Sequence, residues 1–353
     1  MELMKAAHGR RPNMGERAPD NAAPVATPAT VQRLQIAASS AFAMLAGMQL
    51  QLFTSLSAGP RDAEALAAER GVSAERLSRL LYALSACGLL ERRQNGFANT
   101  PEAAKFLVKG LTDYVGGVHE LLDQLWHADL MTALSIRSGR PAAVHDYAAM
   151  TDDELAAMLR GMHGSAVSAA RDLLAQFDFS QCRSLLDVGG GSGGLVAAFC
   201  AARPDAVGVL FELSRTAALA AGILKDVPGG NRVTIETGDI LVAPPHERHD
   251  AVVMRALVQV LSPTDAARAI RNAAAALRPG GAIYITGGGI LDNDRLAPIG
   301  AVFLNVTFMN LYRAGASYTE AEYADWLTAA GCEDVRRAIL ATGASVIHAR
   351  KHR

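Results

Sequence analysis

The sequence has no excess of basic residues. Lysine and arginine number 34 against 35 aspartates and glutamates, which gives a formal net charge of −1. A protein that binds nucleic acid neutralises phosphate groups with a clear surplus of lysine and arginine. The balance therefore argues against nucleic acid as a partner.

Paired cysteines are missing as well. Cys87, Cys182, Cys200 and Cys332 lie far apart, without Cys-x-x-Cys spacing and without the neighbouring histidines of a zinc site. This pattern is typical of small buried side chains in a reducing compartment. We expect no metal, free cysteines and a cytoplasmic location.

A long apolar run is also absent. The longest uncharged stretch, residues 34–60, is interrupted by glutamines and serines, so it falls short of the roughly 20 predominantly apolar residues that a bilayer span needs. Residues 1–30 contain no apolar core of the kind that a secretory signal has. We expect these residues to form a disordered arm and the protein to be soluble, without membrane contact.

With 353 residues the chain suits two domains. Apolar residues at helical spacing mark the segments Val31–Leu52, Ala63–Arg70 and Ala74–Cys87, with Ser73 as a helix cap. A short hairpin follows around Asn95-Gly96. Helix, turn, helix and β-wing make a winged helix, but the third segment carries too little positive charge to favour DNA reading. We interpret it as a folding and dimerisation module.

Residues 112–180 continue mostly helical, with a break at Gly139-Arg140-Pro141 because proline cannot continue a helix. From Ser184 the pattern changes to short apolar runs that alternate with alanine-rich helical stretches. The runs are Ser184–Val188, Gly208–Phe211, Ala251–Met254 and Ala282–Ile285. They are typical of strands buried on both faces in a parallel sheet. The sequence predicts a helical domain over 31–180 and a Rossmann-like, doubly wound α/β domain over 181–353.

A glycine-rich turn follows the first of these strands. Leu185 to Gly194 reads LLDVGGGSGG and leads into a helix over Leu195–Ala202. Such turns let a ligand approach the backbone closely, and they also build dinucleotide sites, so an NAD enzyme is the alternative. The acid Asp187 suits an ammonium group and would repel a pyrophosphate. A second acid, Glu212, ends the next strand, where it can accept both hydroxyls of a ribose.

Two later segments complete a pattern. Asp239 follows the third strand in Thr237-Gly238-Asp239-Ile240, in position to meet an adenine amino group, and Pro279-Gly280-Gly281 turns the chain into another strand. With LSRLLYALSACGLLE in the N-terminal part, these motifs make residues 30–353 resemble the caffeate- and hydroxyindole-type O-methyltransferases.

The resemblance implies a class I methyltransferase domain that binds S-adenosylmethionine (SAM), preceded by a winged-helix dimerisation domain. It also implies a homodimer that acts on a small molecule of secondary metabolism. The cofactor-contacting positions that it implies are Asp187, Gly189, Gly191, Glu212, Asp239 and Arg255. Glu212 stands where the family usually has aspartate, and Arg255 where it often has a basic residue near the adenine.

The sequence departs from the family at its catalytic pair. Gln259 stands where the family has the histidine that deprotonates the acceptor hydroxyl, and Val260 where it has an aspartate. The acid that normally follows the fifth strand is missing from Ile285–Gly289. Because a glutamine amide is no base near neutral pH, the sequence favours base-independent transfer to a sulfur, nitrogen or carbon nucleophile.

Candidate acceptor-site residues lie in the helical segments. His127 or His163 could replace the lost base, and Trp126, Met162, Met309, Asn310 and Tyr312 could line the substrate pocket, with Asn305 and Tyr318 nearby. For each of them the alternative is a helix residue satisfied in the domain interface. Two other functions stay open: an enzyme of the same fold that uses SAM for non-methyl chemistry, such as cyclisation with release of methylthioadenosine, and a winged-helix regulator that senses SAM.

Overall fold

The computed structural model describes residues 26–353 except 112–113 and 115–116. Most of the arm predicted over 1–30 lies outside the described residues, and the first helix, α1 (Ala29–Gln49), begins within that predicted range. The chain divides into two compact units, one up to Ala103 and one from Ala104. None of the helices in the described part of the chain is long and apolar enough to cross a membrane.

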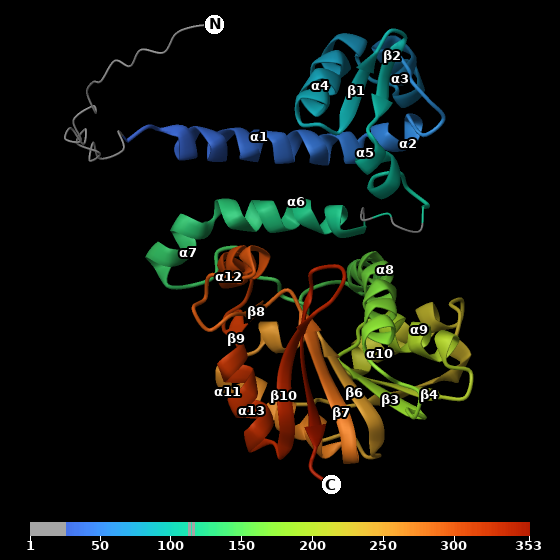
Figure 1. Cartoon of the computed structure of the whole chain (residues 1–353), viewed down its shortest axis with the longest axis vertical. Helices are drawn as coiled ribbons and strands as arrows, with labels where there is room; N and C mark the ends of the chain where they lie inside the picture. Colours follow the sequence, from blue (N-terminus) through green and yellow to red (C-terminus); the bar gives the residue numbers. More distant parts are fainter. Residues whose placement is uncertain (1–25, 112–113, 115–116) are drawn as a thin grey trace, which may run out of the picture. The chain divides into compact units, whose positions relative to one another are not determined.

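The first unit has the predicted order of elements (Figure 1). After α1 come α2 (Leu52–Ser55), α3 (Ala63–Arg70), α4 (Ala74–Ala86) and a hairpin of β1 (Leu90–Arg93) and β2 (Gly96–Asn99). Ser73 caps α4 by accepting from the Arg76 N–H, as predicted. Gly96 is required in the hairpin, since its φ is +130° and a Cβ there would lie 2.1 Å from Arg61 O. The expected helix, turn, helix and wing is therefore confirmed.

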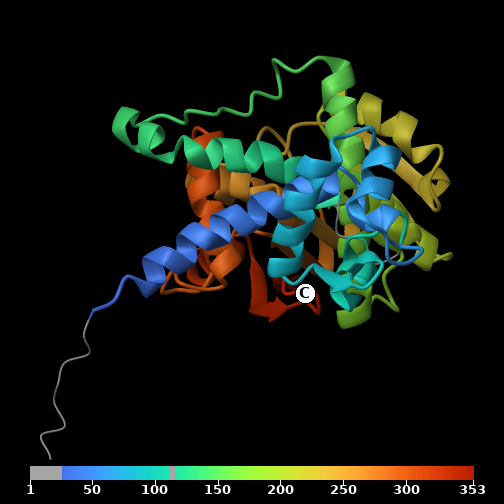
Figure 2. The same ribbon diagram turned by 90° about the horizontal axis from the view of Figure 1, so that it is seen from above.

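The second unit begins within α5 (Pro101–Phe106) and continues with three helices, α6 (Gly117–Leu130), α7 (Thr132–Ser138) and α8 (Asp152–Gln176). Gly139 ends α7 in a left-handed conformation, so the predicted break is confirmed. Residues 139–151, the α7–α8 connection, contain no helix or strand. Figure 2 shows this connection as an extended segment that leads to the start of α8.

A seven-stranded sheet follows in the order β10-β11-β7-β6-β3-β4-β5. Its strands are β3 (Ser184–Val188), β4 (Val207–Glu212), β5 (Val233–Thr237), β6 (His249–Arg255), β7 (Leu277–Gly287), β10 (Cys332–Ile339) and β11 (Ser345–Lys351). The first five are parallel, and β11 and β10 join antiparallel beside β7. The predicted turn at Pro279-Gly280-Gly281 lies inside β7, beside a register shift against β6.

Helices cover both faces of the sheet (Figure 1). Residues of α11 (Pro263–Ala275) and α13 (Glu320–Ala329) fill one core. Residues of α8, α9 (Gly194–Ala202) and α10 (Ser214–Leu224) fill the other. The remaining elements are α12 (Ile299–Leu311), the short strands β8 (Ile290–Leu291) and β9 (Tyr318–Thr319), and the 3-10 turns η1 (Gly230–Arg232) and η2 (Val258–Val260). This is the doubly wound architecture that the sequence predicts.

The division into units differs from the predicted domains. Residues 104–180 belong to the second unit, whereas the predicted helical domain over 31–180 includes them. The reason is that Ala166, Ala170 and Leu173 of α8 pack into the same core as β3 and α9. Helical spacing shows that a segment has an apolar face, but not which core that face joins.

Candidate active site

A cavity of about 350 Å³ lies at the carboxyl ends of β3 and β6. The chain runs from β3 to β4 and β5 on one side and returns to β6 and β7 on the other, so β3 and β6 flank the point where the strand order reverses. Ligands of open α/β sheets bind at such switch points. The walls come from the glycine loop after β3, from α8, α12 and η2, and from the α7–α8 connection.

Asp187 is a fully buried carboxylate on the cavity wall. Neither of its carboxylate oxygens has a hydrogen-bond partner within the described residues. Burial raises its pKa to about 7, the Arg255 guanidinium partly opposes this shift, and the Glu212 carboxylate adds to it. The backbone N–H of Val196 also lies near enough to lower this pKa, although its geometry makes no hydrogen bond. An unpartnered buried carboxylate is costly, so this wall fits a ligand that brings a positive charge. The glycine of residue 190 is needed here, since a Cβ would lie 2.3 Å from Asp187 Oδ2.

The glycine loop links Asp187 to Glu212. Gly189 and Gly191 have φ of +65° and +58°, the left-handed region that favours glycine. The Gly191 N–H donates to Glu212 Oε2 at 3.0 Å, and the Leu213 N–H donates to Oε1 at 2.8 Å. Burial raises the pKa of Glu212, while these bonds hold its carboxylate in place and leave lone pairs for further donors. Glu212 is not on the cavity wall itself, but its carboxylate is bonded to Gly191, which is on that wall.

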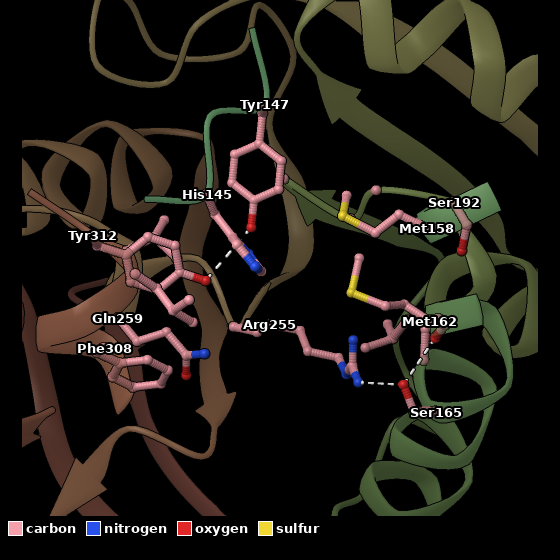
Figure 3. A pocket seen from close by; sticks show the side chains of 18 of the residues that line it. His145, Tyr147, Met158, Met162, Ser165, Ser192, Arg255, Gln259, Phe308 and Tyr312 are labelled. Atoms are coloured by element: carbon pink, nitrogen blue, oxygen red, sulfur yellow. Dashed lines mark hydrogen bonds between the residues drawn. The ribbon is translucent and has the colours of Figure 1, made fainter. Parts of the chain in front are cut away.

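Asp239 and Arg255 lie on different sides of this loop. Asp239 follows β5 beside the end of β4, is exposed and accepts from the Leu241 N–H, and it is not on the cavity wall. Arg255 ends β6, lines the cavity and donates to Ser165 Oγ of α8 at 2.9 Å (Figure 3). Burial lowers its pKa, and the Asp187 carboxylate opposes that shift. Arg255 therefore lies near Asp187, whereas the family resemblance implies a position near an adenine.

Gln259 also lines the cavity, from η2. A Cβ at Gly287 would lie 2.8 Å from Gln259 Oε1, and one at Gly289 would lie 2.9 Å from Gln259 Cβ. Side chains at Gly287 and Gly289, where the family's acid is missing, would therefore collide with the Gln259 side chain. The position offers an amide and no proton acceptor of useful basicity.

The predicted acceptor-site residues divide into two groups. Met162 and Tyr312 line the cavity, whereas Trp126, Met309, Asn310, Asn305 and Tyr318 are not on its wall. Asn310 is buried and donates to Thr132 Oγ1, Asn305 Oδ1 accepts from the Ser317 N–H, and the Tyr318 hydroxyl donates to Leu261 O. These hydrogen bonds give Asn305 and Tyr318 structural partners within the second unit, whereas Asn310 Oδ1 has no partner among the described residues.

Neither predicted replacement base faces the cavity. His127 is exposed on α6, with Nδ1 2.7 Å from Asp123 O. His163 packs behind the glycine loop, with Nδ1 3.0 Å from Ser192 Oγ. His145, which was not predicted from the sequence, lies on the cavity wall with Tyr147, and both belong to the α7–α8 connection. No periodic pattern marks this residue, and its only sequence signal is that it follows the break at Gly139-Arg140-Pro141.

The rest of the cavity wall is mostly apolar. Figure 3 shows Met158 and Met162 from α8 facing Phe308, Tyr312 and Gln259 across the open space, with His145 and Tyr147 at its edge. Leu304 and Leu311 complete the α12 side. The cavity therefore combines a charged end with a wide apolar and aromatic end.

Comparisons with known proteins agree with this geometry. A sequence model described as "O-methyltransferase domain" matches residues 129–333, and one described as "O-methyltransferase dimerisation domain" matches residues 34–109. The 3-hydroxy-5-methyl-1-naphthoate 3-O-methyltransferase of Streptomyces sahachiroi is 30% identical over 298 residues, which cover 83% of this chain and 86% of the relative. The tetracenomycin polyketide synthesis 8-O-methyl transferase of Streptomyces glaucescens is 26% identical over 88% of this chain and 92% of the relative.

Among solved structures, human N-acetylserotonin methyltransferase in complex with SAM superposes with a TM-score of 0.78. It is 19% identical and covers 94% of this chain and 100% of its own. The doubly wound sheet, the glycine loop and these similarities define a SAM-dependent class I methyltransferase that carries an N-terminal dimerisation domain. Within that class, the chain belongs to the O-methyltransferase family of secondary-metabolism enzymes.

Proposed function

We propose that the protein transfers the methyl group of SAM to a hydroxyl of a small, flat, largely apolar molecule, and that it works as a homodimer in the cytoplasm. The observation that carries the proposal is the cavity itself. Its charged end holds an unpartnered buried carboxylate, and its other end is a roomy aromatic and thioether wall. The naphthoate and polyketide substrates named for two relatives are molecules of the kind such a wall suits.

The residues at the charged end fit the cofactor. Asp187 would hold the ammonium group, and Glu212 would accept from the ribose hydroxyls. Gly189 and Gly191 would let the ligand approach the backbone, and Asp239 would lie toward the adenine. Arg255, close to Asp187, suits the carboxylate of the same amino-acid group better than the adenine. When bound, SAM supplies an electrophilic methyl group on a sulfonium.

The acceptor would lie against Met158, Met162, Phe308 and Tyr312, with Gln259 orienting it through its amide. A second candidate follows from Gln259, which cannot take a proton: base-independent transfer to a sulfur, nitrogen or carbon nucleophile. In that case proximity and alignment supply the acceleration.

Mass spectrometry of the nucleoside product tests the proposal. Purified protein incubated with SAM and hydroxylated naphthalenes should release S-adenosylhomocysteine together with a methylated acceptor. Release of methylthioadenosine would instead establish the alternative of non-methyl chemistry. Tight, salt-sensitive binding to a specific DNA in a gel-shift assay, without turnover, would favour the SAM-sensing regulator.

A further inference from the structure

His145 is held rigidly although it lies in a segment without regular structure. The backbone N–H of His145 donates to Leu311 O at 3.0 Å, and the backbone N–H of Ala143 donates to Asn310 O at 3.0 Å. These two bonds join this part of the connection to the end of α12. On the other side, Arg215 of α10 donates to Tyr147 O at 3.1 Å and to Asp152 Oδ1 at 2.8 Å. A side chain fixed on both sides in this way can act at a defined position in the cavity.

The His145 ring is poised to accept a proton. Neither ring nitrogen has a hydrogen-bond partner within the described residues, so both are available to a ligand. Burial lowers the pKa of His145 and so favours the neutral imidazole, the form that can accept a proton. Among the described residues, it is the histidine on the cavity wall.

The groups that face His145 do not compete for this role. Tyr147 and Tyr312 contact its ring edge-on, with centroids 6.1 and 6.4 Å away. Burial raises the pKa of Tyr312, so its phenol stays neutral. The charged groups on the same cavity are Arg255 from β6 and Asp187 from β3, at the cofactor end. Gln259, from η2, is uncharged.

We propose that His145 is the general base of this enzyme, replacing from the α7–α8 connection the histidine that Gln259 has displaced. The inference rests on the proposed transfer to a hydroxyl. The acceptor O–H gives its proton to a ring nitrogen of His145, and its oxygen bonds to the methyl carbon. The S–C bond breaks with its electron pair left on sulfur, so a neutral thioether is formed, and the imidazolium later releases its proton to solvent.

The role of His145 as a base can be tested without methyl transfer, from the ionisation of a coloured phenol bound in the cavity. 4-Nitrophenol, whose anion absorbs visible light, is titrated with pH on the protein saturated with S-adenosylhomocysteine. If His145 accepts the proton, the apparent pKa of the bound probe should rise by about 1 in His145→Gln, a tenfold loss of ionisation. His246→Gln is the matched control, since His246 is exposed and bonds Glu236. Calorimetry with S-adenosylhomocysteine verifies that each variant folds.

Three outcomes overturn the assignment: an unchanged probe pKa in His145→Gln, an equal change in His246→Gln, or a wild-type cavity that binds no phenol. In turnover, the variant should lose about 10²-fold or more in kcat with weakly acidic naphthols, and less with the more acidic nitrophenol, whose transfer depends less on a base. The proposed function fails separately, if the ionised probe is bound normally but no acceptor is ever methylated.

Discussion

At the scale of single residues, two buried acids, Asp187 and Glu212, differ in how their carboxylates are satisfied. Asp187 has no hydrogen-bond partner within the described residues, whereas Glu212 is already held by two backbone N–H groups. The Asp187 carboxylate therefore lacks a partner until a cation binds. The Glu212 carboxylate is already oriented by its two hydrogen bonds before any ligand binds. These differences lead to separate predictions.

The first prediction concerns pH and Asp187. Its pKa in the folded protein lies near 7, above the ordinary value of 3.8, so the folded state holds this proton more tightly than the unfolded state. The unfolding free energy of the cofactor-free protein should fall as pH rises from about 4 to 7, by at most about 1.4 kcal/mol per pH unit.

Urea titrations across this pH range measure the effect. Asp187→Asn should remove that part of the slope and should also weaken SAM binding, whereas Asp226→Asn, on an exposed turn, should change neither. A slope that persists unchanged in Asp187→Asn would show that other groups cause it.

The second prediction concerns Glu212. Removing its carboxylate in Glu212→Ala should weaken SAM binding by about 1 to 3 kcal/mol, the scale of hydrogen bonds to a charged group. Calorimetry measures the loss. Glu236→Ala is the control, because Glu236 lies on the adjacent strand and bonds His246 instead. Equal affinity of Glu212→Ala and wild type would contradict the ribose assignment.

At the scale of elements, the α7–α8 connection places His145 and Tyr147 on the cavity wall where the acceptor is proposed to bind. Arg215 joins this connection to α10 through Tyr147 O and Asp152. Arg215→Ala should loosen it, raise the acceptor KM several-fold and speed proteolysis within residues 142–151, since misplacement of a site group is costly. Kinetics and limited digestion test this, with Arg268→Ala on α11 as control. Identical digestion of both variants would show that Arg215 does not hold the connection.

The same scale shows what the sequence could and could not predict. Part of the fold follows from caps and periodicity: β3 begins and ends as predicted, and Ser73 caps α4. The antiparallel strands β10 and β11 were not predicted. Asp187, Gly191 and Glu212 were predictable because the turn chemistry of the loop is local. His145 was not, because backbone bonds to Asn310 and Leu311, far along the chain, determine its position. His163 was predicted to face the acceptor, but it contacts Ser192 of the glycine loop. Helical spacing does not distinguish the face of α8 that lines the cavity from the face that packs against this loop.

At the scale of the whole molecule, each compact unit leaves apolar side chains in solvent. In the first unit, Val31, Leu34, Ile36 and Phe42 of α1 are 50 to 66% exposed. In the second, Leu130, Leu134 and Ile136 of α6 and α7 are also more than half exposed. Apolar surface of this extent on helices marks an interface.

The resulting prediction is a homodimer. Light scattering at micromolar concentration should give twice the mass of the chain, and Ile36→Glu with Phe42→Glu should shift it toward the monomer. Glu substitutions at Val207 and Val242, which are exposed on the second unit, are the control. A wild-type monomer at this concentration would refute the interface.

The most direct test of the central claim follows the methyl group itself. Protein is incubated with SAM carrying a ¹³C-labelled methyl group and an equimolar mixture of 2-naphthol, 2-naphthylamine and 2-naphthalenethiol, which differ only in the nucleophilic atom. The ¹³C chemical shift of the product identifies the atom that received the label. Transfer to the hydroxyl through His145 predicts an O-methyl signal that His145→Gln greatly reduces. Label found on nitrogen or sulfur alone, and insensitive to that substitution, would contradict the account.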